Sequence, residues 1–138
     1  MLWAQGKKDD GVRTLTAAAM LEDTTDKSAI TPGPLAPAHE LLGEMLLEAS
    51  QPANALKEFQ ANLKKDPNRF RSLYGAGRAA ELAGNRTAAH GYYSQLVKIC
   101  ERADRGSRTD LEHARQYIGA STASAAPVSR YRLGQSTP

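Results

Sequence analysis

Three small residues, Gly75, Gly77 and Ala80, form the pattern G-x-G-x-x-A, which binds a pyrophosphate where a strand turns into a helix. Glu101 follows near the distance at which an acid could bind the ribose. Such a turn must follow a buried strand, yet residues 63–74 read LKKDPNRFRSLY, with a proline stop and little β-branched character. The pattern therefore favours an ordinary helix rich in small residues, and a nucleotide-binding or catalytic domain built on it is the disfavoured alternative.

Other residue types that commonly carry chemistry are present but are not grouped. The histidines, His39, His90 and His113, fall in different parts of the chain, without the His-Glu-x-x-His or Cys-x-x-Cys spacing of metal sites. Cys100 is the single cysteine, which excludes an intramolecular disulfide, and its apolar neighbours in a predicted helix indicate an unreactive thiol. No Gly-x-Ser-x-Gly nucleophile elbow occurs. We therefore expect no enzyme activity, no metal site and no bound cofactor.

The composition is that of one modest globular domain. Of 138 residues, 41% are hydrophobic and 24% are charged, and no uncharged apolar run approaches the roughly 18 residues that a membrane span needs. A soluble protein without membrane insertion is expected. The net charge of +3 comes largely from interspersed acidic and basic residues, so nucleic acid is not an expected partner. Polyanion binding by the basic C-terminal end, through Arg130, Tyr131 and Arg132, is a weaker alternative.

The N-terminal residues leave the compartment of the protein open. Met1 is followed by LWAQGKK, which lacks the basic start and the apolar segment of a secretory signal. A cytoplasmic location is expected if Met1 is the true start. A periplasmic or exported location is compatible with a chain that is part of a longer protein.

The chain contains an internal repeat with a period of 34 residues, found by aligning residues 41–63 with residues 75–97. Residues of similar size and polarity then coincide: Gly43 with Gly77, Leu46 with Ala80, Ser50 with Gly84, Ala55 with Ala89, Phe59 with Tyr93 and Leu63 with Val97. Apolar residues recur at helical spacing on both sides of a turn in each unit. Each unit is therefore predicted to be a helical hairpin.

Small residues and turn residues fit this geometry. Pro52 suits the first turn of a second helix, where its missing N–H costs nothing, and the residues DPN at 66–68 end that helix. Gly43 and Gly77 fall on the first helices of their units, where a large side chain would force the paired helices apart. We therefore predict a close helix approach at both glycines.

The units LLGEMLLEASQPANALKEFQANLKKDP and LYGAGRAAELAGNRTAAHGYYSQLV resemble tetratricopeptide repeats. The resemblance implies an all-α fold, a right-handed α-solenoid of antiparallel helix hairpins, spanning residues 1–119. We place complete repeats at residues 36–69 and 70–104. A partial repeat at residues 1–23 lacks most of its leading helix, because a turn is expected at Gly6.

Three segments depart from the repeat pattern. Residues 24–36 carry two prolines and are predicted to be an extended loop. A capping box formed by Thr109 and Glu112 begins a capping helix at residues 109–119. Residues 120–138 lack an apolar period, which predicts a disordered tail.

The truncated first repeat leads to an expectation about self-association. The chain is interpreted as beginning inside a longer array, so the end of the solenoid should show Trp3, Val12 and Leu15 to water. Such a surface would bind the missing segment or a second copy of the chain.

The resemblance implies a protein-protein interaction scaffold whose concave groove binds a peptide or a partner helix. The groove side of the first helices is expected to present seven residues: Glu40, Glu44, Leu47, Arg71, Tyr74, Arg78 and Glu81. Arg71 and Arg78 flank Tyr74 by one turn, which suits an acidic, partly hydrophobic ligand. Chaperone-binding members of the family clamp a terminal carboxylate where Glu40 and Glu44 stand here, so such tails are not expected ligands. The alternative left open is that Glu40 and Glu44 pair with the two arginines as solvated ion pairs.

Overall fold

The structure, a computed structural model, describes residues 2–24, 36–101 and 109–124, and the side chains among them from residue 6 to residue 123. The regular elements in these ranges are all helices: α1 (Leu2–Thr24), α2 (Ala38–Glu48), α3 (Pro52–Lys65), α4 (Phe70–Leu82), α5 (Arg86–Ile99) and α6 (Thr109–Ser124). The predicted all-α class is therefore confirmed. None of the six is long and apolar enough to cross a membrane.

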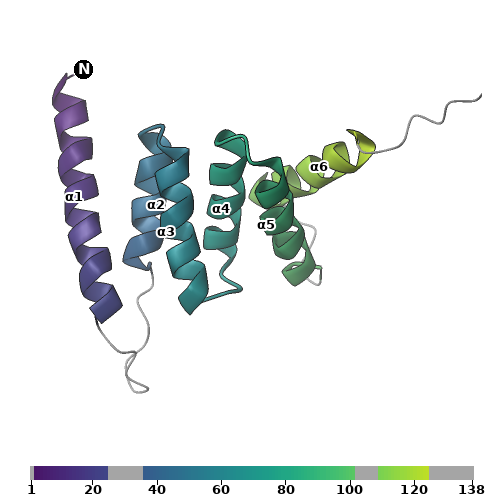
Figure 1. Cartoon of the computed structure of the whole chain (residues 1–138), viewed down its shortest axis with the longest axis horizontal. Helices are drawn as coiled ribbons and strands as arrows, with labels where there is room; N and C mark the ends of the chain where they lie inside the picture. The colour runs from purple at the N-terminus through teal and green to yellow at the C-terminus, as the bar shows by residue number, and fades with distance from the viewer. Residues whose placement is uncertain (1, 25–35, 102–108, 125–138) are drawn as a thin grey trace, which may run out of the picture.

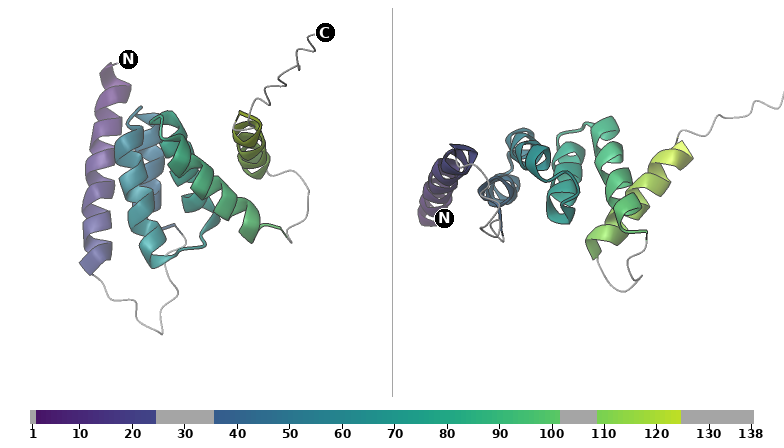
Figure 2. Two further views of the ribbon diagram at one scale, coloured as in Figure 1. Left: turned by 45° about the vertical axis from the view of Figure 1, so that its right-hand side comes forward. Right: turned by 90° about the horizontal axis from the view of Figure 1, so that it is seen from below.

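The helices pack side by side in chain order (Figure 1). Each contacts the next, and α4 also contacts both α2 and α6. α1 lies at one end of the row, and α6 crosses the other end obliquely (Figure 2). α2, α4 and α6 therefore lie next to one another on one side of the row.

The same turn joins the helices of both pairs, α2–α3 and α4–α5. In each turn an N–H just past the first helix donates to a carbonyl of that helix at 2.8 Å: Gln51 to Leu46, and Asn85 to Ala80. The residue before the donor has a positive φ, 58° at Ser50 and 79° at Gly84. This bonding is that of a Schellman cap, which satisfies carbonyls that the helix end leaves free. The 34-residue correspondence predicted from the sequence therefore holds for both turns.

A contact between a glycine and an aromatic ring sets the spacing within each pair. A Cβ added to Gly43 would lie 2.8 Å from Cζ of Phe59, and one added to Gly77 would lie 2.7 Å from Cδ1 of Tyr93. Both rings are fully buried. Carbon atoms do not pack this closely, so a larger residue at either position requires the helices to move apart. The predicted close approach at the two glycines is confirmed.

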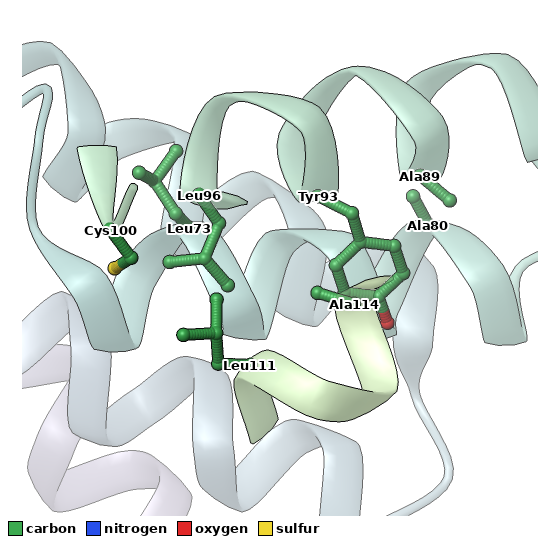
Figure 3. Packing of buried hydrophobic residues seen from close by; sticks show 8 residues of the cluster. All are labelled: Leu73, Ala80, Ala89, Tyr93, Leu96, Cys100, Leu111 and Ala114. Atoms are coloured by element: carbon green, nitrogen blue, oxygen red, sulfur yellow. The ribbon is translucent and has the colours of Figure 1, made fainter. Parts of the chain in front are cut away.

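The buried side chains form two clusters, one centred on each helix pair. The cluster around Phe59 contains Ala19, Leu42, Leu46, Ala55, Ala76 and Ala79. The cluster around Tyr93, seen in Figure 3, contains Leu73, Ala80, Ala89, Leu96, Cys100, Leu111 and Ala114. α1 contributes to the first cluster and α6 to the second, so these two helices cover opposite ends of the core.

The N-terminal segment differs from the expected partial repeat, because α1 is one continuous helix from Leu2 to Thr24 and no turn forms at Gly6. A glycine inside a helix lowers the stability of the helix by only about 1 kcal/mol relative to alanine, and a long helix tolerates this loss. A Cβ at Gly11 would meet the end of the flexible Met45 side chain on α2, so the two helices lie close together at this point.

The exposed apolar side chains of α1 are not those expected from the sequence. Val12 and Leu15 are partly buried against the Phe59 cluster. Met20 and Leu21 are instead exposed, with 67% and 69% of their surfaces accessible. The side chain of Trp3 lies outside the described residues.

The C-terminal helix is longer than predicted, ending at Ser124 rather than Gly119. Space around Gly119 is open, and the hydroxyl of Thr122 donates to its carbonyl at 2.9 Å. One glycine therefore does not end the helix, and residues predicted to belong to the tail continue it. Most of the expected loop, residues 25–35, and most of the expected tail, residues 125–138, lie outside the described residues.

Candidate functional site

A hollow of about 250 Å³ is lined by residues of α2, α3, α4 and α6. The lining consists of Glu44, Leu47, Phe59, Arg71, Tyr74, Gly75, Arg78 and Asp110. Five of these eight residues are among the seven that the sequence predicts for the groove: Glu44, Leu47, Arg71, Tyr74 and Arg78. Asp110, contributed by α6, is absent from that prediction. We call this surface the α2–α4–α6 hollow.

Helical spacing on α4 places three of the lining side chains together. Arg71, Tyr74 and Arg78 follow one another by three and four residues, so they project from the same face of α4. Gly75 lies between them, and a Cβ there would lie 2.8 Å from Cε2 of Phe59. The ring of Phe59 therefore packs directly against the backbone of α4, which requires glycine at this position.

The G-x-G-x-x-A residues serve helix packing in the structure. Gly75, Gly77 and Ala80 all lie inside α4 and are all buried. No strand precedes them within the described ranges, where the elements before α4 are helices. Their N–H groups lie within a helix rather than in a phosphate-binding turn.

One of the two predicted charge pairings is present at the rim of the hollow. Nη2 of Arg71 lies 2.8 Å from Oε1 of Glu44, and both side chains are partly exposed. Nε of Arg71 is also 3.9 Å from Oε1 of Glu40. Arg78 behaves differently, because Nη1 of Arg78 is 3.5 Å from Oε2 of Glu81 on the same helix. The ion-pair alternative is therefore confirmed for Arg71 and wrong for Arg78.

Glu40 does not line the hollow, and its side chain is fully buried. Its carboxylate accepts two hydrogen bonds from Arg69, at 2.7 and 3.1 Å, and one from the hydroxyl of Ser72 at 2.6 Å. Nδ2 of Asn62 donates in turn to the Ser72 hydroxyl at 2.7 Å. Helical spacing places Glu40 on the same face as Glu44, but residues at the start of α4 cover it. The buried charge is paired and hydrogen-bonded, as burial requires.

Glu81, the seventh predicted residue, does not line the hollow but fastens α6 to α4 and α5. Its Oε2 accepts a hydrogen bond from the hydroxyl of Tyr93 at 2.8 Å and from Nε2 of His113 at 3.0 Å. Burial acts to raise the pKa of Glu81, but the hydrogen bonds from His113 and Tyr93 outweigh it and the pKa is lowered. Burial, and then the bond to Glu81, raises the pKa of Tyr93. The cluster is therefore a buried hydroxyl held by an ionised carboxylate.

Tyr74 is held in place between this cluster and the hollow. Its ring centroid lies 6.1 Å from that of Tyr93 and 6.1 Å from that of His113, the latter edge to face. Burial raises the pKa of Tyr74, and the nearby charge of Asp110 adds to the rise. Arg78 acts in the opposite direction on the same group. The charges of Asp110 and Arg78 therefore both act on the Tyr74 hydroxyl.

A second charged cluster, not anticipated from the sequence, joins α1 to the pair α2–α3. His39 is buried, with Nδ1 2.7 Å from Oε2 of Glu58 and Nε2 3.0 Å from Oδ1 of Asp23. Nζ of Lys65 lies 2.6 Å from the same Asp23 oxygen. Burial lowers the pKa of His39, but its bonds to Glu58 and Asp23 outweigh this and the pKa is raised. Carboxylates accept hydrogen bonds, so the protonated ring, which has a donor on each nitrogen, satisfies both contacts.

The side chains of the described residues do not suggest a metal centre. No group of three or more His, Cys, Asp or Glu in these ranges is arranged to hold an ion. Comparison with known proteins adds nothing to the interpretation, since no protein-family model and no curated protein sequence matches the chain. The α2–α4–α6 hollow is therefore interpreted from its own residues.

Proposed function

We propose that the chain is a protein-interaction module of tetratricopeptide type, whose α2–α4–α6 hollow binds an extended peptide or a partner helix. The supporting observation is the hollow itself, which gathers residues from four helices and combines apolar and charged side chains. Peptide-binding surfaces commonly have this composition. The proposed role involves binding alone, with no catalysis and no cofactor.

The proposed architecture is a right-handed α-solenoid of antiparallel hairpins. Its support is the repetition, after 34 residues, of the turn at Ser50 and Gly84 and of the glycine-aromatic contacts at Phe59 and Tyr93. Helices that contact only near neighbours in the chain are typical of solenoid folds. In this arrangement α2, α4 and α6 line the concave side.

The ligand we propose for the hollow carries an acidic group and an apolar side chain. Leu47 and the ring of Tyr74 provide surface for an apolar side chain, and the guanidinium group of Arg78 provides donors for a carboxylate. Arg71 is already paired with Glu44, so its part in binding requires exchange of that partner. Such an exchange is accessible because the pair is partly exposed.

Selection from a random dodecapeptide library tests this function. Selected peptides are synthesised with a fluorescent label, and their affinities are measured by fluorescence polarisation against the wild type and against the double variant Arg71→Gln and Arg78→Gln. We expect affinity to fall by about tenfold or more, which corresponds to roughly 1.4 kcal/mol. The matched control is Lys57→Gln with Arg86→Gln, which removes equal charge from exposed residues of α3 and α5 outside the hollow.

Thermal unfolding of each variant shows whether the fold is kept. The proposal is contradicted if the selected peptides bind the hollow variant and the control variant equally well. Binding of heparin, but of no selected peptide, would instead favour the polyanion alternative at the C-terminal end.

A further inference from the structure

The two arginines of the α2–α4–α6 hollow differ in how far their charges are already matched. Arg71 lies 2.8 Å from Glu44 and 3.9 Å from Glu40, so two carboxylates face it. Among the residues that the structure describes, the ion pair of Arg78 is one long contact of 3.5 Å to Glu81. That carboxylate oxygen already accepts bonds from Tyr93 and His113. Arg78 is therefore the cation of the hollow with the greater capacity to bind an added anion.

Asp110 places an acidic group in the same hollow. It belongs to the first turn of α6 and is partly buried, and its charge acts on Tyr74. Within the described parts of the chain no hydrogen bond or ion pair to its carboxylate is found. The four charged residues of the lining, Glu44, Arg71, Arg78 and Asp110, sum to zero net charge. A purely acidic ligand therefore gains no net attraction from the hollow as a whole.

We propose, on the basis of the peptide-binding function above, that the hollow recognises a mixed-charge segment: an acidic group on Arg78, a basic group on Asp110, and an apolar side chain between them. Tyr74 lines the hollow, and the charges of Arg78 and Asp110 both act on it. An acidic group beside Asp110 would meet like charge in a partly enclosed space, which disfavours a doubly acidic segment. In this account α6 sets the specificity of the hollow, and Asp110 is the residue that does so.

A panel of four labelled peptides tests the charge pattern: GSELLKSG, GSKLLESG, GSELLESG and GSKLLKSG. The two mixed-charge sequences cover both chain directions across the hollow. We expect one of them to bind the wild type about fivefold to tenfold more tightly than GSELLESG, as measured by fluorescence polarisation. Asp110→Asn should remove this preference. Asp110→Lys should reverse it, so that GSELLESG binds best.

The matched control is Glu112→Gln, which removes one negative charge from the exposed side of α6. It should keep the preference of the wild type. Thermal unfolding and circular dichroism confirm that α6 remains folded in each variant. Tightest binding of GSELLESG to the wild type, or an unchanged preference in both Asp110 variants, would overturn the mixed-charge proposal while leaving peptide binding intact. Absence of binding by all four peptides and by every library peptide would overturn both proposals.

Discussion

The two helix pairs, α2–α3 and α4–α5, pack in the same way but differ at two corresponding positions, a buried aromatic ring and the position that Glu81 occupies in the second pair. In α2–α3 the buried ring is Phe59, and the residue 34 positions before Glu81 is Leu47, which packs against the same apolar cluster. In α4–α5 the ring is Tyr93, and its hydroxyl donates to Glu81. The hydroxyl and its acceptor occur together in one pair and are both replaced by apolar groups in the other. Buried hydroxyls require such a partner.

This difference extends to the helices at the two ends of the row. Glu81 also binds His113, so the polar group of the second pair fastens α6. The first pair has no equivalent on its groove side and fastens α1 elsewhere, through His39, Asp23 and Glu58. The second pair contributes Arg71, Tyr74 and Arg78 to the lining of the hollow, whereas the first pair contributes Glu44, Leu47 and Phe59. Similar backbones in the two pairs therefore present different side chains to the hollow.

The largest expected effect tests the glycine-aromatic contact common to both pairs. Gly77→Leu would insert a side chain where even a Cβ overlaps the ring of Tyr93. We expect a loss of more than about 3 kcal/mol in unfolding free energy, measured by denaturant titration. Gly91 is the control, since it lies on α5 with open space around it, and Gly91→Ala should stabilise by about 0.5–1 kcal/mol. Equal stability of the wild type and the Gly77 variant would contradict the close-approach account.

A double-mutant cycle sharpens the comparison between the rings. Phe59→Tyr adds a hydroxyl to the first pair without an acceptor at Leu47 and should cost about 1–3 kcal/mol. Adding Leu47→Glu should recover part of that loss, because it recreates the arrangement of Tyr93 and Glu81. The measured quantity is the coupling free energy from four unfolding curves. A coupling indistinguishable from zero would show that the two positions are not linked as we argue.

A pH experiment separates the two ends of the molecule. The pKa of His39 is raised above its value of about 6.5 in the unfolded chain, so its contribution is present below that pH and is lost as pH rises through the folded pKa. Asp23, Glu58 and the nearby Lys65 face this ring. Between about pH 6 and pH 9 we expect α1 to lose hydrogen-exchange protection, corrected for intrinsic rates, by an amount on the order of 1 kcal/mol.

The matched variant for this experiment is His39→Gln, in which the pH-dependent loss should disappear. Protection of α6, which depends on Glu81, provides the internal comparison. Constant protection of α1 over the whole range in the wild type would rule out the proposed contribution of His39.

The smallest expected effect concerns the two turns. Ser50 has a φ of 58° and Gly84 a φ of 79°, a region in which glycine is less strained than other residues. Ser50→Gly should therefore stabilise the protein by about 0.5–1 kcal/mol, and Gly84→Ser should destabilise it by a similar amount. Thermal unfolding in parallel measures both. Changes of the same sign in both variants would show that the turns are not equivalent.

The sequence predicts those features that depend on local spacing. The 34-residue period predicts the four central helices, the two turns and the close approach at Gly43 and Gly77, because each depends on residue size at a fixed position. Helical spacing also predicts five residues of the hollow. The burial of Glu40 was not predictable in this way, since it depends on how Arg69 and Ser72 at the start of α4 lie across α2.

The side chains at the two ends of the molecule are less predictable, because their positions also depend on contacts between different helices. The position of Asp110 depends on the angle at which α6 crosses α4 and α5, which no periodicity encodes. The His39 cluster gathers residues from three helices far apart in sequence, so spacing along the chain gives no signal for it. Glycine is typical of turns, but Gly6 lies inside α1, because a long helix tolerates a single glycine.

An amide chemical-shift titration of the isotopically labelled chain, with the tightest peptide selected from the library, tests whether the hollow binds peptide. We expect the chemical shifts that change to be confined to the lining of the hollow and adjacent residues, above all Leu47, Tyr74, Arg78 and Asp110. The outer residues of α3 and α5 should remain unchanged. Shift changes centred instead on the exposed Met20 and Leu21 of α1, or on residues 125–138, with the hollow unaffected, would contradict peptide binding by the hollow.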